Sequence, residues 1–404
     1  MPEAQLVSWV AVLAVSAGLS ASLILIVALV LAVAGCGVVA RDADQAQFPP
    51  ADDTDFKSRC ASDAVVLCVG FDGHSDIPSA TDAARFGVFP SASDPTVAPT
   101  LDPMVRASGA GALKFTIPSN SAADTSGSYF ANFSKDLSVQ FGERQHFFVQ
   151  WRQRFSRHFL ENRYRAVGGP GGWKQAIVGS GDQPQKRYYS CSDLEVVVNN
   201  GYQRGFPQMY NSCNGSSSHG AYDGFQEPFG PSDFRLQNAR SSSYCLSSQG
   251  VSNPPAFFPP SGNCFGYAPE EWMTFQIGFE IGRRVGDEFR DSFVRLWVAR
   301  ENQPSELVIL WGPYNLSAGS PAEDQRFGKV WLLPYNTDKD PRPTYTVAYT
   351  WYDELIVSRE RIPDPVGTPE RAIPVDATGT ADCLPARERR SPGARNGQRC
   401  TASN

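Results

Sequence analysis

Residues 146–155 read His146-Phe147-Phe148-Val149-Gln150-Trp151-Arg152-Gln153-Arg154-Phe155, and their alternation of apolar and polar side chains decides the fold. Successive side chains of a β-strand point to opposite faces of the sheet. One face therefore carries Phe147, Val149, Trp151 and Phe155, and the other carries His146, Gln150, Arg152 and Arg154. The stretch predicts a strand with one face in a hydrophobic core and a polar face outside it.

The same pattern recurs in residues 272–281. The apolar side chains expected in the core are Met273, Phe275, Ile277, Phe279 and Ile281, and those expected to face away are Trp272, Thr274, Gln276 and Glu280. Further strands are expected at Val65 to Phe71, Ala112 to Ile117, Trp173 to Val178, Leu194 to Asn199, Phe293 to Ala299, Leu307 to Trp311, Val330 to Leu333 and Tyr345 to Val357. With 35 Gly, 31 Pro and 25 Phe but four Met, the composition favours turns between short aromatic strands over long helices. We therefore expect an all-β, two-sheet antiparallel sandwich.

The N-terminus predicts export or membrane attachment. No charged residue occurs between Leu6 and Val39, a run longer than the ~20 residues that span a bilayer. Within it, Val33-Ala34-Gly35-Cys36 looks like a bacterial lipobox, in which Cys36 would receive lipid after signal-peptide cleavage. The alternative is a plain transmembrane anchor, because Glu3 precedes the run and no basic residue does. Both interpretations place the rest of the chain outside the cytoplasm, tethered to a membrane.

The other cysteines support an oxidising compartment. Apart from Cys36 there are eight, an even number that permits complete pairing: Cys60, Cys68, Cys191, Cys213, Cys245, Cys264, Cys383 and Cys400. Their spacing suggests the local bridges 60–68, 191–213, 245–264 and 383–400, although other pairings are open. A structural zinc site is the weaker alternative, because no C-x-x-C pair is present and the four His lack ligand spacing.

Composition also divides the chain. We expect an anchor or signal at 1–40, a linker at 41–56, the β-sandwich domain at 57–362, and a tail at 363–404 rich in Pro and Arg. A net charge of −6 offers no sequence-wide basic surface for a phosphate backbone, so nucleic acid is an unfavourable partner.

Two short segments resemble a known superfamily. Cys68-Val69-Gly70-Phe71-Asp72 near the start and Thr350-Trp351-Tyr352-Asp353-Glu354-Leu355-Ile356-Val357-Ser358 near the end look like the concanavalin A-like lectins and glucanases. The resemblance implies a jelly roll whose concave sheet binds sugar chains, and the chain is nearest in character to the polysaccharide lyases of that fold. It also implies that a structural calcium ion is possible, with Asp72, Asp76 or Asp353 as ligands, while no cofactor is required.

Retaining hydrolysis is the less favoured chemistry. Glucanases of this fold supply two carboxylates about 5 Å apart from a Glu-x-Asp-x-x-Glu strand. That motif is absent, and Asp193 with Glu195 is the nearest approximation.

A uronate lyase needs a group that neutralises the sugar carboxylate, a base for the proton alpha to it and an acid for the leaving oxygen. Our candidate catalytic residues are Arg152, Lys174, Gln175, Tyr210, His146 and Tyr335, and our candidate sugar-binding residues are Gln150, Arg154, Asn199, Tyr202, Trp272 and Gln276. We expect Lys174, Arg152, Gln175 and Tyr210 to line one cleft. The alternative is a non-catalytic carbohydrate-binding or cell-surface domain, in which rings such as Trp272 and Trp311 stack on sugars.

Overall fold

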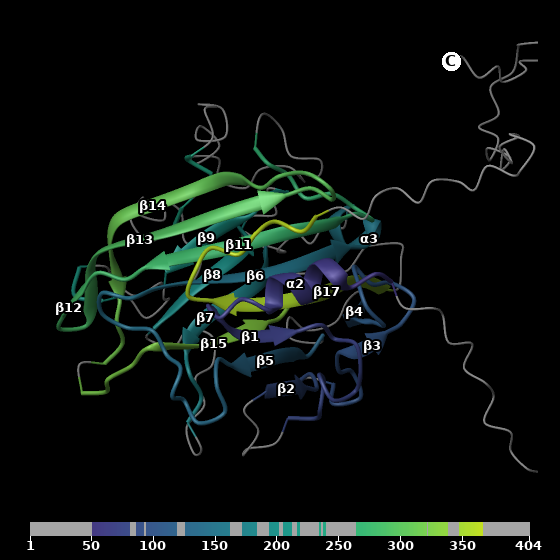
Figure 1. Cartoon of the computed structure of the whole chain (residues 1–404), viewed down its shortest axis with the longest axis horizontal. Coiled ribbons are helices and arrows are strands. Elements are labelled where there is room, and N and C mark those ends of the chain that lie inside the picture. Colours follow the sequence, from purple (N-terminus) through teal and green to yellow (C-terminus); the bar gives the residue numbers. More distant parts are fainter. Residues whose placement is uncertain are drawn as a thin grey trace, which may run out of the picture. The chain divides into compact units, whose positions relative to one another are not determined.

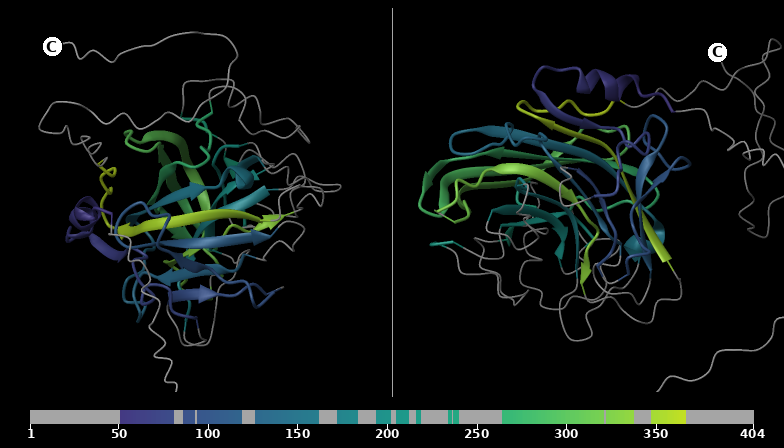
Figure 2. Two further views of the ribbon diagram at one scale, coloured as in Figure 1. Left: turned by 90° about the vertical axis from the view of Figure 1, so that its right-hand side faces the viewer. Right: turned by 90° about the horizontal axis from the view of Figure 1, so that it is seen from below.

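The computed structural model describes residues 51–80, 86–92, 94–118, 126–161, 172–183, 194–201, 205–211, 216–218, 234–235, 237–239, 264–320, 322–337 and 347–366. Its strands form two antiparallel sheets, drawn as two layers in Figures 1 and 2. Two short helices, α2 (Thr54–Cys60) and α3 (Arg157–Glu161), accompany them. In the described part of the chain no helix is long and apolar enough to cross a membrane.

The first sheet has nine strands. Its order is β12 (Arg283–Val285), β13 (Glu288–Ala299), β11 (Trp272–Glu280), β6 (His146–Phe155), β17 (Val347–Ser358), β4 (Ala112–Pro118) and β3 (Thr100–Asp102), with β1 (Val65–Val69) beside β17 and β14 (Glu306–Ser317) beside β13.

The second sheet has eight strands. Its order is β10 (Phe234–Arg235), β9 (Gln208–Asn211), β8 (Glu195–Asn200), β7 (Gly172–Ser180), β15 (Phe327–Leu332), β5 (Ser128–Asn132) and β2 (Phe86–Phe89), with β16 (Asn336–Thr337) beside β7. Every strand range predicted from the sequence contains a strand, so the all-β sandwich is confirmed.

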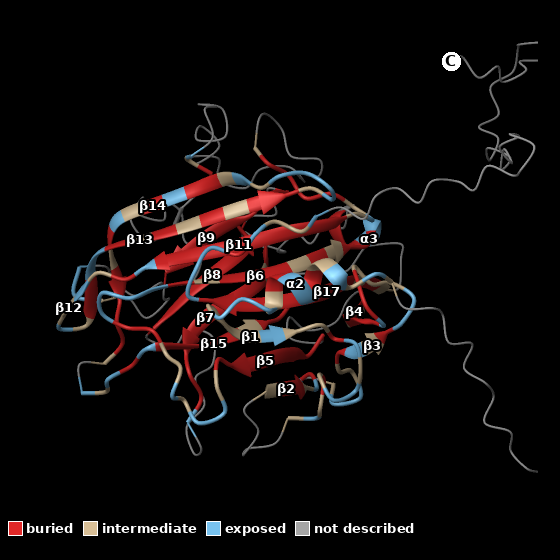
Figure 3. Cartoon of the chain, viewed as in Figure 1, coloured by how far each residue is buried: buried red, intermediate tan, exposed pale blue. Residues whose placement is uncertain are grey.

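The inner faces of the two sheets enclose one large core, visible as the buried strands in Figure 3. Strand β6 contributes Phe147, Val149, Trp151 and Phe155, as the alternation predicted. Strands β6 and β11 pair in continuous register from Trp272 opposite Arg154 to Glu280 opposite His146. Apolar burial at roughly 25 cal/mol per Å² makes this aromatic core the main source of stability.

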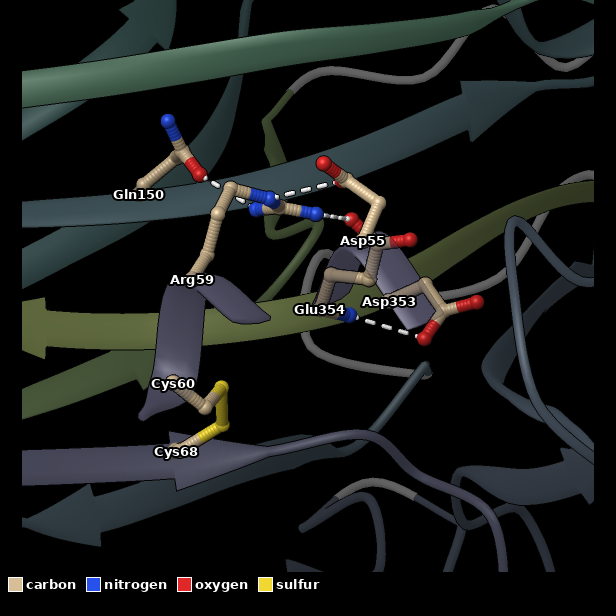
Figure 4. Close-up of a disulfide and its surroundings, with 7 residues drawn as sticks. All are labelled: Asp55, Arg59, Cys60, Cys68, Gln150, Asp353 and Glu354. Atoms are coloured by element: carbon tan, nitrogen blue, oxygen red, sulfur yellow. Dashed lines mark hydrogen bonds and ion pairs between the residues drawn. A yellow bond between two sulfur atoms is a disulfide. The ribbon is translucent and has the colours of Figure 1, made fainter. Parts of the chain in front are cut away.

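The outer face of the nine-stranded sheet is covered in part by both ends of the described domain. Helix α2 lies on it, and Figure 4 shows the Arg59 side chain in contact with Gln150 and Glu354. From the other end, Ile362 exchanges two hydrogen bonds with Gln276. Residues just outside the predicted limits of 57 and 362 also pack on this face, because Phe56 is buried against Ile356 and the carbonyl oxygen of Pro363 accepts from Nε2 of Gln150.

A disulfide joins Cys60, at the end of α2, to Cys68 in β1, as the spacing predicted. Cys264 is also disulfide-bonded, and its partner lies outside the described residues, as do Cys36, Cys191, Cys213, Cys245, Cys383 and Cys400. The bridge ties α2 to β1, which pairs with β17.

We expect the double substitution Cys60→Ala/Cys68→Ala to lower the free energy of unfolding by about 2–3 kcal/mol, because a short closed loop removes that much entropy from the unfolded chain. Urea unfolding of the full chain measures it, with Cys36→Ala as the matched control outside the domain. Equal midpoints for all three proteins would show that the bridge contributes nothing.

Candidate functional site

Polar residues from three neighbouring strands of the eight-stranded sheet lie side by side, in a row that crosses the strands. Lys174 of β7 lies opposite Asn199 of β8, and Asn199 lies opposite Gln208 of β9. The next pair, Val198 and Met209, belongs to the main core, so the row points away from it. This outward face carries the candidate site.

Lys174 sits in a partly enclosed position on that face. Its backbone N–H donates to the carbonyl oxygen of Tyr335 at 3.1 Å, and its Nζ lies 5.1 Å from the centre of the Tyr335 ring. Burial lowers the pKa of the Lys174 ammonium below its usual value, while the Glu195 carboxylate acts in the opposite direction. A lysine with a lowered pKa can serve as a proton acceptor.

Two amide oxygens in the row of Lys174 lack partners. Among the described residues, Oδ1 of Asn199 and Oε1 of Gln208 are buried and accept no hydrogen bond, although Nε2 of Gln208 donates to Gly201 at 3.1 Å. An unpaired buried acceptor costs about 1–3 kcal/mol, so such groups are normally satisfied. Two hydroxyl groups of a ligand, one for each oxygen, would satisfy them.

The next row is apolar and forms the floor of the face. Its buried members are Ile177, Val197, Phe206, Tyr210 and Leu333, with Trp331, Tyr335 and Cys264 packed against them. Tyr210 lies opposite Val197 and is nearly fully buried, whereas Tyr335 is half-buried. Tyr335 is therefore the more accessible of the two predicted tyrosines.

A third row holds an ion pair that the sequence analysis missed. Lys329 of β15 contacts Asp182 at 2.6 Å, with both side chains at most 6% exposed. Asn132 donates from Nδ2 to the Asp182 carbonyl oxygen and accepts from its N–H. These residues are far apart in sequence, so no local motif revealed them.

The predicted site residues do not form one cluster. Lys174, Tyr210, Tyr335 and Asn199 share the outward face of the eight-stranded sheet, but His146, Gln150, Arg152, Arg154, Trp272 and Gln276 lie on the outward face of the nine-stranded sheet. Gln175 points into the core between them, where it bonds Gln153 and Tyr267. The expected cleft of Lys174, Arg152, Gln175 and Tyr210 is wrong, because alternation predicts a face without saying which sheet a strand joins. Tyr202 and Asp193 lie outside the described residues.

On the nine-stranded sheet these side chains have structural partners. Arg152 pairs with Glu354 at 3.3 Å, Arg154 pairs with Glu270 at 3.1 Å, and Nε1 of Trp272 donates to the Arg106 carbonyl at 3.1 Å. Gln150 and Gln276 bond the segment at 362–363. Trp311, proposed to stack on sugars, is fully buried in the core.

His146 borders a hollow. A depression of about 460 Å³ is lined by His146, Arg144, Arg295, Glu280 and Phe148 with their neighbours. Glu280 pairs with Arg295 at 3.1 Å. The hollow lies on the sheet opposite Lys174, so it is no part of the candidate site.

The predicted calcium ligands are engaged with backbone groups. Oδ2 of Asp353 accepts from the N–H of Ala107 and Ser108, and burial raises the pKa of this carboxyl well above its usual value. Asp76 accepts from the N–H of Asp72 at 2.9 Å. In the described ranges no three His, Cys, Asp or Glu side chains are grouped as metal ligands.

Comparisons with known proteins give fold relatives at low similarity. No family model matches, and no curated protein matches. Solved structures that the chain resembles include a PL-14 alginate lyase from Aplysia kurodai, with 11% identity over 72% of this chain and 98% of that one and a TM-score of 0.39. An endo-beta-1,4-glucuronan lyase from Trichoderma reesei shows 13% identity over 67% and 90%, with a TM-score of 0.37.

A lectin-like defence protein from Phaseolus vulgaris, arcelin-5, is also similar, at 8% identity over 72% of this chain and 96% of that one with a TM-score of 0.34. The resemblance predicted from residues 68–72 and 350–358 thus recurs among solved structures. Similarities this weak support no conclusion about activity, and the sandwich assignment stands on the sheet topology.

Proposed function

We propose that this protein is an extracytoplasmic polysaccharide lyase that cleaves uronate polymers by β-elimination on the outward face of the eight-stranded sheet. The observation that supports this most strongly is the row of Lys174, Asn199 and Gln208, in which a lysine of lowered pKa shares one row with two amide oxygens that lack partners.

Each reacting group has a candidate. Asn199 and Gln208 bind the sugar beside its carboxylate, and their amide groups can present N–H donors to it or accept from its hydroxyls. Neutral Lys174 removes the proton alpha to the carboxylate. The electron pair of that C–H bond forms the new carbon–carbon double bond, the glycosidic C–O bond breaks, and the leaving oxygen takes a proton from Tyr335.

The experiment is incubation of the purified full chain in detergent with a panel of uronate polymers that includes alginate and glucuronan. The expected result is ultraviolet absorbance from an unsaturated uronate at the new chain end. No absorbance on any polymer, with saturable binding retained, would replace this proposal by the non-catalytic alternative.

That alternative also has an observation in its favour. Trp331, Tyr335 and the two amide oxygens offer an aromatic, hydrogen-bonding surface of the kind that binds sugars without any base. Binding alone requires no base, so cleavage of a polymer separates the two functions, and the titration of Lys174 tests whether a base is available.

The stability of the protein should report that titration. Lys174 has a lower pKa in the folded chain than its usual value of 10.5, so the unfolded chain binds the proton more tightly. Stability of the wild type relative to Lys174→Met should therefore rise with pH between the lowered pKa and 10.5. Urea unfolding of both proteins across this window measures the difference, and a difference independent of pH would contradict a lowered pKa.

We also propose that the N-terminus tethers the domain to a membrane, by lipid on Cys36 or by a transmembrane segment. The Cys60–Cys68 disulfide supports an oxidising location. Metabolic labelling with a radioactive fatty acid should mark the wild type and not Cys36→Ala. Equal labelling of both would exclude lipidation at Cys36, and labelling of neither would leave the transmembrane form.

A further inference from the structure

One extra residue in β7 decides which way Lys174 points. Ala176 pairs with Val198 of β8, and Lys174 pairs with Asn199, the very next residue. Gln175 therefore has no partner on β8, which defines a β-bulge.

The bulge changes the alternation of side chains along the strand. Ala176 and Val178 face the core, and Ile177 between them faces outward. Strict alternation from Ile177 would turn residue 175 outward and Lys174 into the core. Because Gln175 and Ala176 both face inward, Lys174 is returned to the outward face beside Asn199.

Fully buried hydrogen bonds hold Gln175 in this inward position. Its Nε2 donates to Oε1 of Gln153 at 2.9 Å, and its Oε1 accepts from the Tyr267 hydroxyl at 2.6 Å. Its backbone carbonyl oxygen accepts from the Tyr352 hydroxyl at 2.9 Å.

The other sheet supplies two of these partners. Gln153 belongs to β6 and Tyr352 to β17, and Gln153 Nε2 donates onward to Thr350 at 3.0 Å. Burial raises the pKa of Tyr267 and of Tyr352 well above the usual value, so both hydroxyls remain protonated donors. The bulge is thus tied through the core to the nine-stranded sheet.

We propose that Gln175, held by Tyr352, Tyr267 and Gln153, is a positioning residue that fixes the bulge and thereby aims Lys174 at the substrate. This inference rests on the proposed function for its effect on catalysis, but the orientation of Lys174 can be measured without any substrate. It assigns Gln175 a role through Lys174 in place of the direct contact expected from the sequence.

The decisive variant is Tyr352→Phe, which removes the hydroxyl bonded to the bulge carbonyl and keeps the ring. The chain offers a matched control in Tyr129→Phe, because the Tyr129 hydroxyl is fully buried and has no hydrogen-bond partner among the described residues. Gln175→Met is a second variant that removes both side-chain hydrogen bonds at similar volume.

The first readout is the rate at which a small amine-reactive reagent modifies Lys174 as a function of pH, followed by peptide mass spectrometry of the full chain. A loosened bulge should let Lys174 reach water, so its titration midpoint should rise toward 10.5 in Tyr352→Phe and Gln175→Met. Tyr129→Phe should match the wild type. Midpoints equal in all four proteins would overturn the inference.

The second readout is turnover of the polymer that the wild type cleaves. Misplacing a reacting group by about 1 Å costs about a hundredfold, so kcat should fall by about that factor in Tyr352→Phe, with a smaller change in KM. A rise in KM with an unchanged kcat would contradict a positioning role. If the wild type cleaves no polymer, the proposed function fails while the labelling still decides whether the network orients Lys174.

Discussion

Replacing Lys174 with alanine is expected to lower kcat on a uronate polymer by about 10²- to 10⁴-fold, the contribution of a positioned general base. The reason is that Lys174 is the one described residue of the row whose neutral form can accept a proton, and burial favours that form. Initial rates of ultraviolet absorbance measure the loss.

Two companion variants make this test specific. Lys174→Arg keeps the positive charge but cannot give up its proton, so it should be as inactive as Lys174→Ala. Lys57→Ala removes an exposed lysine of α2 that pairs with Asp53, and it should leave the rate unchanged. Full activity in Lys174→Arg would show that the residue acts through its charge, as a binding group.

Replacing Arg59 with methionine is expected to lower the free energy of unfolding by about 3 kcal/mol, because the buried carboxylate of Glu354 then loses the positive charge of Arg59. The Arg59 and Glu354 side chains are 3% and 2% exposed and form an ion pair. Arg59 also donates to Gln150 at 2.7 Å and to Asp55 at 2.9 Å, as Figure 4 shows. Arg152 still contacts Glu354 in this variant, so the expected loss of stability lies at the lower end of the range for breaking a buried ion pair.

Urea unfolding measures this loss, with Lys57→Met as the control on the same helix. Arg59→Met/Glu354→Gln should recover part of the stability, because the uncompensated charge is then absent. If Arg59→Met unfolds at the same urea concentration as the wild type, the ion pair does not hold α2 in place.

The sequence predicted the faces of the long strands and could not predict their sheets. In β6 and β11 most apolar residues enter the core and most polar ones leave it, because burial of one face imposes a period of two. Gln153 is a polar residue that faces inward, and Phe148 and Trp272 are apolar residues that face outward. Arg152 and Lys174 both face outward, but from opposite sheets, and only long-range pairing decides that. Short strands such as β9 (Gln208–Asn211) have too few residues to show any period.

The site was predicted in part for a related reason. Lys174, Asn199, Tyr210 and Tyr335 do share one face, whereas Gln208 and the Lys329–Asp182 pair were missed. Gln175 was expected in the cleft but lies in the core. The sequence could not show this, because the bulge depends on the pairing of β7 with β8 and on partners from the other sheet. The outer polar face of β6 resembled a binding surface because the sequence did not show that Arg59 and Ile362 return to cover it.

The proposed function requires that sugar binds to the outward face of the eight-stranded sheet. The most direct test is photocrosslinking of a uronate oligosaccharide carrying a diazirine to the full-length Lys174→Ala protein, with the modified residues identified by mass spectrometry. Adducts are expected on β7, β8, β9 and the segment around Tyr335, and unlabelled oligosaccharide should compete for these positions. Competed adducts confined to β6 and β11, around Arg154 and Trp272, would contradict it.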